Sequence, residues 1–191
     1  MEEEDSGIVS SVKDGIIGAI RGVGEITDAV VDTVSGSLIN AVKKTGAVGG
    51  ALTSAISETV RGTIQGAAEV GGDIGAAAKG AVIGVLRGTK EVGGEAIDTI
   101  GTTASAVVTS TSEVGGDLGS AAKGAVEGAI EGAKDIGVSA EDAAAAAASG
   151  ALKAAGDISS TAVEQVRNAL TGTISGVKVV LKEPFKEEQN N

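Results

Sequence analysis

The side chains in this sequence that could take part in chemistry are hydroxyls, carboxylates and amines. Its 191 residues include no His and no Cys. This excludes a Ser-His-Asp triad, a thiol nucleophile, a zinc finger, a haem ligated by His and an iron–sulfur site. The chain also lacks the Gly-Lys-Ser/Thr sequence of a phosphate-binding P-loop. We therefore expect a protein that is not an enzyme and that holds no cofactor.

Carboxylates recur at a fixed spacing along the chain. Glu69, Glu91 and Glu113 follow one another at intervals of 22 residues, which is about 33 Å along a single helix. At that distance they cannot share a metal ion unless neighbouring helices bring them together. The adjacent Glu141 and Asp142 are typical of a solvated surface. We predict no metal site.

These carboxylates belong to an internal repeat of 22 residues. The segment Glu-Val-Gly-Gly-Asp at 69–73 recurs almost unchanged at 91–95 and 113–117, and 69–90 is identical to 113–134 at 15 of 22 positions. Units that start at 3, 25, 47, 69, 91, 113, 135 and 157 cover residues 3–178 without an insertion. Residues 1–2 are an acidic N-terminus, and 179–191 are interpreted as a C-terminal tail.

The repeat contains a stripe of aliphatic residues. Position 18 of the unit is aliphatic in all eight units, and position 2 is Val or Ile in seven. Apolar positions recur about every 3.67 residues, which is a helical period and not that of a strand. This apolar stripe, a helix–helix seam or a face that binds an apolar surface, includes Ile20, Val42, Ile64, Leu86, Val108, Ile130, Leu152 and Ile174, with Val70, Val92 and Val114 from position 2.

Glycine also occupies fixed positions in the repeat. A ridge at positions 12, 16 and 20 is complete in two units, as Gly80, Gly84, Gly88, Gly124, Gly128 and Gly132. Such a ridge either lets another backbone approach closely or merely weakens the helix. Each interior Gly costs about 1 kcal/mol relative to Ala. An isolated helix of this composition is therefore not expected to be stable without packing or an external surface.

The expected fold is all-α, with long amphipathic Gly/Ala-rich helices folded back into an antiparallel hairpin or bundle. We predict a reversal within 99–116, which is rich in β-branched and hydroxyl residues and ends in Gly-Gly. Alternatively, each Gly-Gly pair, at 49–50, 71–72, 93–94 and 115–116, is a turn between shorter helices, and the Asp or Glu that follows is an N-cap. The stripe keeps its phase through these pairs, which favours the longer helices.

The charge distribution limits the partners of the chain. The formal net charge is −11, and Lys43 and Lys44 are the only adjacent cations. Without a basic face we expect no binding to nucleic acid and little attraction to anionic lipid. The longest uncharged stretch, 99–112, is too short to span a bilayer, and the acidic N-terminus is unlike a signal peptide. A cytoplasmic location is the expectation.

In period and composition, segments such as GAVIGVLRGTK at 80–90 and EVGGDLGSAAK at 113–123 resemble those of a broader class of proteins. This class comprises the perilipins, synucleins, exchangeable apolipoproteins and late-embryogenesis-abundant proteins. The resemblance covers 3–178. It implies a chain that becomes helical on lipid, on another apolar surface or on drying.

Three functions are compatible with these observations. The first is a non-enzymatic structural protein that coats a neutral lipid or particle surface, or associates with copies of itself, through its stripe and glycine ridge. The second is a protectant against stress or desiccation. The third is a self-contained Gly/Ala-packed helical bundle that acts as an interaction scaffold.

Overall fold

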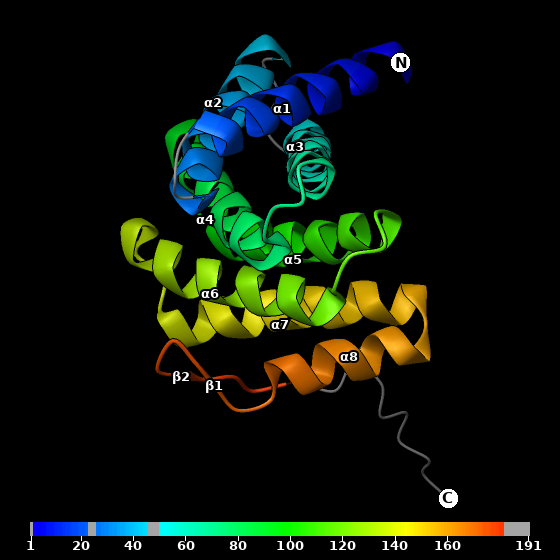
Figure 1. The fold of residues 1–191 in the computed structure, drawn as a ribbon. Helices are drawn as coiled ribbons and strands as arrows, with labels where there is room; N and C mark the ends of the chain where they lie inside the picture. Colours follow the sequence, from blue (N-terminus) through cyan, green and yellow to red (C-terminus); the bar gives the residue numbers. More distant parts are fainter. Residues whose placement is uncertain (1, 23–25, 46–49, 182–191) are drawn as a thin grey trace, which may run out of the picture.

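The computed structural model describes residues 2–22, 26–45 and 50–181. Within these ranges the chain is almost entirely helical (Figure 1), which confirms the prediction of an all-α fold. The helices are α1 (Glu2–Gly22), α2 (Ile26–Thr45), α3 (Gly50–Glu69), α4 (Ile74–Val92), α5 (Ala96–Glu113), α6 (Leu118–Ile136), α7 (Ala140–Ile158) and α8 (Ser160–Leu170), followed by the short strands β1 (Thr173–Ile174) and β2 (Val177–Lys178).

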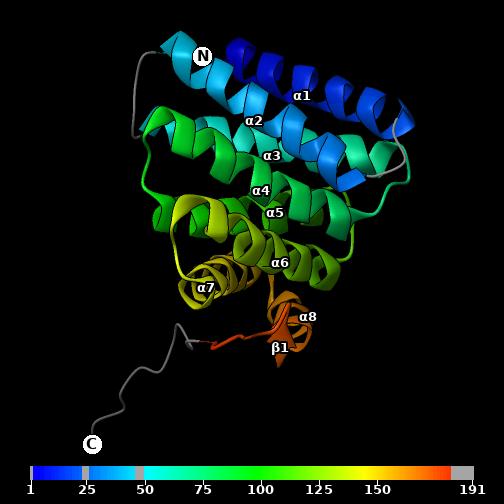
Figure 2. The ribbon, with the colours of Figure 1, turned by 90° about the vertical axis from the view of Figure 1, so that its left-hand side faces the viewer.

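The helices are stacked in two layers. Each helix packs against its neighbour in sequence and, in most cases more extensively, against the helix after that. The odd-numbered helices therefore form one layer and the even-numbered helices the other, and the pairs follow one another down the stack (Figure 2). The predicted packing of helices against one another is confirmed, in the form of stacked helical hairpins.

Three of the turns between these helices lie at Gly-Gly pairs, and the turn before α7 lies at Gly137. Gly71, Gly93, Gly115 and Gly137 all have left-handed backbone angles, with φ of 67°, 78°, 68° and 75°, a conformation in which a Cβ is penalised. After each of them the next N–H donates to the carbonyl five residues earlier, as from Gly94 to Thr89. Helix-ending bonds of this kind close the last turn. Gly49 lies outside the described residues.

Each helix is consequently shorter than the long helices that the unbroken phase of the stripe favoured. The stripe keeps its phase because every unit has the same length, whether or not a turn separates the units. In the predicted reversal at 99–116, residues 99–113 are helical as part of α5, and the chain turns only at 114–117. Comparable turns occur between α3 and α4, between α4 and α5, and between α6 and α7.

Side-chain caps begin three of the helices that follow these turns. The Asp73 carboxylate accepts from Ala76 N at 2.9 Å, and Asp117 accepts from Ser120 N at 2.8 Å. Ser139 accepts from Asp142 N and donates to the Asp142 carboxylate. Glu95, at the equivalent position before α5, makes no capping bond with its side chain.

This difference between caps predicts a difference between two matched variants. Asp117→Ala removes a capping acceptor, so we expect it to lower the free energy of unfolding by about 1 kcal/mol. Glu95→Ala occupies the same repeat position but removes no capping bond, and we expect a change of less than about 0.5 kcal/mol. Urea denaturation followed by circular dichroism measures both. If both variants lowered the free energy of unfolding equally, the Asp117 carboxylate would act through its charge and not through the capping bond.

The glycine ridges lie where helices of one layer meet. A Cβ on Gly84 would be 2.8 Å from both the Val31 carbonyl oxygen and the Val34 Cβ in α2. In α6, a Cβ on Gly128 would likewise collide with the backbone of α4, and one on Gly132 would be 2.8 Å from the Leu86 Cδ1. Aliphatic side chains of one helix therefore occupy the space over the glycines of the next helix in the layer. This contact brings the backbones close together.

Ion pairs connect the same helices at the surface. Lys13 pairs with Glu69, Arg61 with Glu113, Lys79 with Glu131 and Arg87 with Asp135. The hydrogen bond from Lys79 to Glu131, with nitrogen and oxygen 2.7 Å apart, raises the pKa of the Lys79 ammonium above its ordinary value of 10.5. Because this pKa is raised on folding, the pair stabilises the fold below pH 10.5 and loses its contribution as the pH rises through the higher value.

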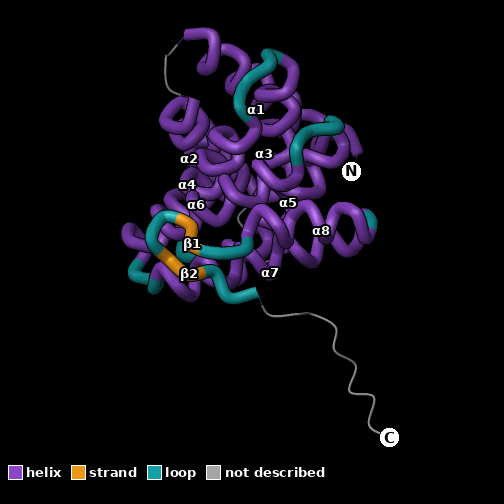
Figure 3. Tube along the Cα trace, turned by 60° about the horizontal axis from the view of Figure 1, so that its bottom comes forward, coloured by secondary structure: helices purple, strands orange, loops and turns teal. Residues whose placement is uncertain are grey.

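The last unit departs from the predicted helical repeat. The helix prediction for 157–178 is wrong after Leu170, because 173–178 form a two-stranded hairpin that turns at Ser175 and Gly176, both with positive φ. The hairpin contacts α6 and α7 (Figure 3). Val179 is also buried. The remainder of the predicted tail, from 182 onward, lies outside the described residues.

Candidate functional site

The residues of the apolar stripe lie inside the helical stack. Position 18 is buried on a helix in six units, as Val42, Ile64, Leu86, Val108, Ile130 and Leu152, whereas Ile20 is half-buried. Ile174 is also buried, but it lies on β1 and not on a helix. Val70, Val92 and Val114 are half-buried beside the turns. In this structure the stripe is therefore a seam between helices.

Few large apolar side chains face solvent. In the described ranges the exposed ones are Ile97, Ile158 and Val180, which belong to different elements and form no stripe. No described helix combines the length and the apolar character that crossing a membrane requires. The described surface therefore offers no continuous apolar face.

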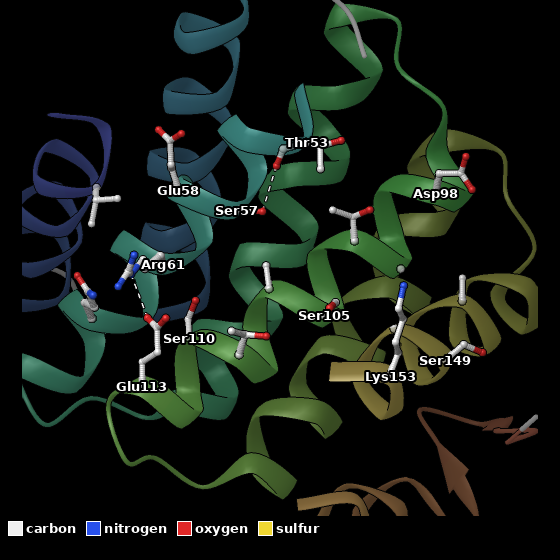
Figure 4. A pocket seen from close by; sticks show the side chains of 18 of the residues that line it. Thr53, Ser57, Glu58, Arg61, Asp98, Ser105, Ser110, Glu113, Ser149 and Lys153 are labelled. Atoms are coloured by element: carbon white, nitrogen blue, oxygen red, sulfur yellow. Dashed lines mark hydrogen bonds and ion pairs between the residues drawn. The ribbon is translucent and has the colours of Figure 1, made fainter. Parts of the chain in front are cut away.

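The described structure has a groove of 1370 Å³ formed only by the odd-numbered layer. Helices α3 and α5 contribute most of its lining, with smaller parts from α1 and α7. The lining residues are Val9, Ser10, Thr53, Ser57, Glu58, Arg61, Gln65, Ile97, Asp98, Gly101, Thr102, Ser105, Ala106, Thr109, Ser110, Glu113, Ala146, Ser149, Gly150 and Lys153. Figure 4 shows side chains from these helices converging on it.

The groove follows from a gap in the glycine ridge. Positions 12, 16 and 20 of the unit face the preceding helix of the same layer, as Gly62 faces α1 and Gly84 faces α2. In α5 these positions hold Thr102, Ala106 and Ser110, all of which line the groove. Their side chains prevent the close approach that glycine allows, and α3 and α5 accordingly make less extensive contact than α4 and α6.

Hydroxyl groups dominate the polar lining of the groove. Eight Ser and Thr residues line it, and among the described residues only the Ser57 hydroxyl makes a hydrogen bond, donating to the Thr53 carbonyl at 3.1 Å. Outside the groove, Thr63 and Thr103 donate to the carbonyl one turn earlier, whereas the buried hydroxyls of Thr59, Thr89 and Thr111 have no hydrogen-bond partner in the described part of the chain. The groove thus presents hydroxyls that retain donors and acceptors for a ligand.

Of the two cations that line the groove, one forms an ion pair with a described residue and the other does not. At one end Arg61 of α3 pairs with Glu113 of α5, with Nε and Oε2 3.0 Å apart. At the other end Lys153 extends from α7 toward α5, between Asp98 and Ser105 (Figure 4). Lys153 makes no ion pair or hydrogen bond with the described part of the chain. Of the two cations in the lining, it is the one available to a ligand.

The groove presents hydroxyl and charged groups that can bind a ligand. Among the described residues, no groove hydroxyl makes a hydrogen bond to a carboxylate or an amine. No group of three or more Asp or Glu within the described ranges could hold a metal ion. The predicted stripe and glycine residues are brought together in the helix contacts, and none of them lines the groove.

Sequence reasoning missed the groove, although a signal was present. The unit at 91–112 is the only one of the eight with no glycine at positions 12, 16 and 20. The same unit carries the hydroxyl-rich segment interpreted above as a chain reversal. The similarity of this chain to known proteins offers no further guide, because no known protein family matches the sequence and no curated protein is significantly similar to it.

Proposed function

We propose that the protein is a non-enzymatic interaction scaffold that binds an extended polypeptide segment in the groove between α3 and α5. The observation that carries the proposal is the row of groove hydroxyls without internal hydrogen bonds. A peptide backbone offers both N–H donors and carbonyl acceptors along its length, and a hydroxyl can both donate and accept. Concave surfaces of stacked helical hairpins commonly serve as binding surfaces.

The dimensions of the groove suit such a ligand. Its lining along α5 extends from Ile97 to Glu113, a helical rise of about 24 Å. An extended chain advances about 3.3 Å per residue, so about seven ligand residues fit alongside α5. A single extended strand of this size matches the length of the groove.

The groove lacks what other ligand classes would require. Bases of single-stranded nucleic acid usually stack on aromatic side chains, and the groove lining has none. With a net charge of −11, the chain also repels a phosphate backbone. These observations favour a polypeptide.

The buried stripe weighs against the surface-coating hypothesis. A coat protein would have to turn its Val and Ile residues outward, which in this fold means breaking the contacts between layers. The protectant hypothesis expects a chain that is disordered when hydrated, whereas the packed helices support a self-contained scaffold. Self-association and a cytoplasmic location stay predictions.

The test uses a random heptapeptide library displayed on phage, with Ser105→Trp as a groove-blocking variant. Ser105 is half-buried and lines the middle of the groove, so an indole there fills the ligand's path. Asn168→Trp, on the exposed surface of α8, is the matched control. We expect peptides selected on the wild type to bind Asn168→Trp equally and Ser105→Trp at least about tenfold more weakly.

Circular dichroism and a thermal melt of each variant ensure that a loss of binding is not a loss of fold. Peptides that bind Ser105→Trp as tightly as the wild type would refute the proposed site. Failure to select any peptide on the wild type would refute polypeptide binding itself.

A further inference from the structure

We infer that Lys153 determines which segments the groove accepts, by binding the side-chain carboxylate of an Asp or Glu in the polypeptide. This inference rests on the proposed function and specifies its ligand. Two observations carry it, namely the position of Lys153 in the groove lining and the absence of a described ion pair to its ammonium.

The other groove cation is already neutralised. Arg61 pairs through its Nε with Glu113 across the gap between α3 and α5, so its positive charge is already compensated and attracts a ligand carboxylate less strongly. Lys153 has no such ion pair among the described residues. The Ser149 hydroxyl lies one turn earlier on α7 and also lines the groove, where it can donate a second hydrogen bond to the same carboxylate. Charge-assisted hydrogen bonds of this kind are stronger than neutral ones.

The geometry favours a side-chain carboxylate over the C-terminal carboxylate of a ligand. Terminal carboxylates are typically captured by clusters of free backbone N–H groups. Lys153 lies in the C-terminal half of α7, and the groove there is also lined by Gly101, Thr102 and Ser105, beyond the first turn of α5. Backbone N–H groups at these positions are already bonded within the helix. The lining continues on both sides of this position, toward Ile97 and toward Thr109. A chain can therefore pass the ammonium and place a side chain on it.

Asp98 limits how many acidic residues the bound segment can carry. It lines the same end of the groove and makes no ion pair with the described part of the chain. Its charge disfavours a second ligand carboxylate close by, because like charges repel. We therefore expect one acidic residue in the bound segment, and not an acidic run.

The experiment compares heptapeptides that are acetylated and amidated, so that no terminal charge contributes. Peptides selected on the wild type are synthesised with their acidic residue as Glu or replaced by Gln. We expect the Glu form to bind the wild type about tenfold more tightly. This ratio should fall to about one in Lys153→Gln and invert in Lys153→Glu, while Lys134→Gln, an exposed cation of α6 without a described ion pair, keeps the wild-type ratio.

The outcomes separate this inference from the proposed function. A Glu-to-Gln ratio that is the same in Lys153→Gln as in the wild type would overturn the role of Lys153, even if Ser105→Trp still blocks binding. A gain in affinity from a free C-terminus, with no gain from Glu, would overturn the side-chain assignment. If no peptide bound the wild type at all, the proposed function and this inference would fall together.

Discussion

Replacing Gly124 by alanine is expected to destabilise the protein by about 1 to 2 kcal/mol, although alanine is the better helix former. A Cβ at this position in α6 would overlap the carbonyl group of Gly75 in α4. The obstacle is backbone, so no rotamer change relieves it and the two helices must move apart. Overpacking costs about 1–3 kcal/mol, which outweighs the gain of about 1 kcal/mol in helix propensity. Urea denaturation followed by circular dichroism measures the loss.

The matched control is Gly36→Ala in α2. Gly36 occupies the same position of the repeat, but a Cβ there would meet nothing within 4 Å, because no helix precedes α2 in its layer. At Gly36 only the difference in helix propensity between Gly and Ala acts, so we expect the free energy of unfolding to rise by about 0.5 to 1 kcal/mol. Opposite signs for one substitution at one repeat position would establish that the layer contact makes glycine necessary. A gain at both positions would refute close packing at Gly124.

The helical period and the buried residues were accessible from the sequence for a physical reason. Aliphatic residues recur at position 18 because that face must leave water, and Ile64, Leu86 and Val108 are accordingly buried. What the stripe packs against was not accessible. A seam and a surface-binding face have the same period, and only the arrangement of helices distinguishes them.

The turns at the Gly-Gly pairs were the less favoured of two predictions, and the groove was not predicted, for a different reason. A turn of constant length in a repeat of constant length leaves the phase of the stripe unchanged, so phase could not exclude a reversal at Gly71 or Gly93. The hydroxyls at Thr102, Ser105 and Ser110 lower helix propensity, which suggested a break. In the structure, packing against α7 and α3 holds α5 helical, and these hydroxyls face the groove. Tertiary contacts outweighed local preference there.

In the last unit the 22-residue pattern extends beyond the end of α8. Ile174 satisfies the aliphatic position 18 and is buried as the frame predicts, yet it reaches the interior from β1. Gly172, Ser175 and Gly176 adopt positive φ, which a continuing helix cannot accommodate. Position 18 is therefore buried in this unit as in most others, but on a strand and not on a helix.

Replacing Leu86 by alanine is expected to lower the free energy of unfolding by about 3 kcal/mol in buffer without lipid. Leu86 is 1% exposed, and its Cδ1 occupies the space above Gly132 of α6. Truncation removes apolar contacts and leaves a cavity that two helices held close by glycine cannot readily fill, and such changes cost about 3 to 5 kcal/mol. The control is Ile97→Ala, at an aliphatic residue that is 44% exposed, for which we expect a change of about 0.5 kcal/mol or less.

This pair of variants also separates the functions that the sequence left open. In a self-contained scaffold the stripe is the core, so Leu86→Ala lowers the midpoint of a cooperative transition that needs no ligand. In a coat protein the free chain has no such core, and the same substitution would change only the helicity gained on a neutral lipid emulsion. A wild type without cooperative unfolding in buffer, or a Leu86→Ala midpoint equal to that of Ile97→Ala, would therefore contradict the scaffold. The groove would then have no rigid walls to bind a peptide.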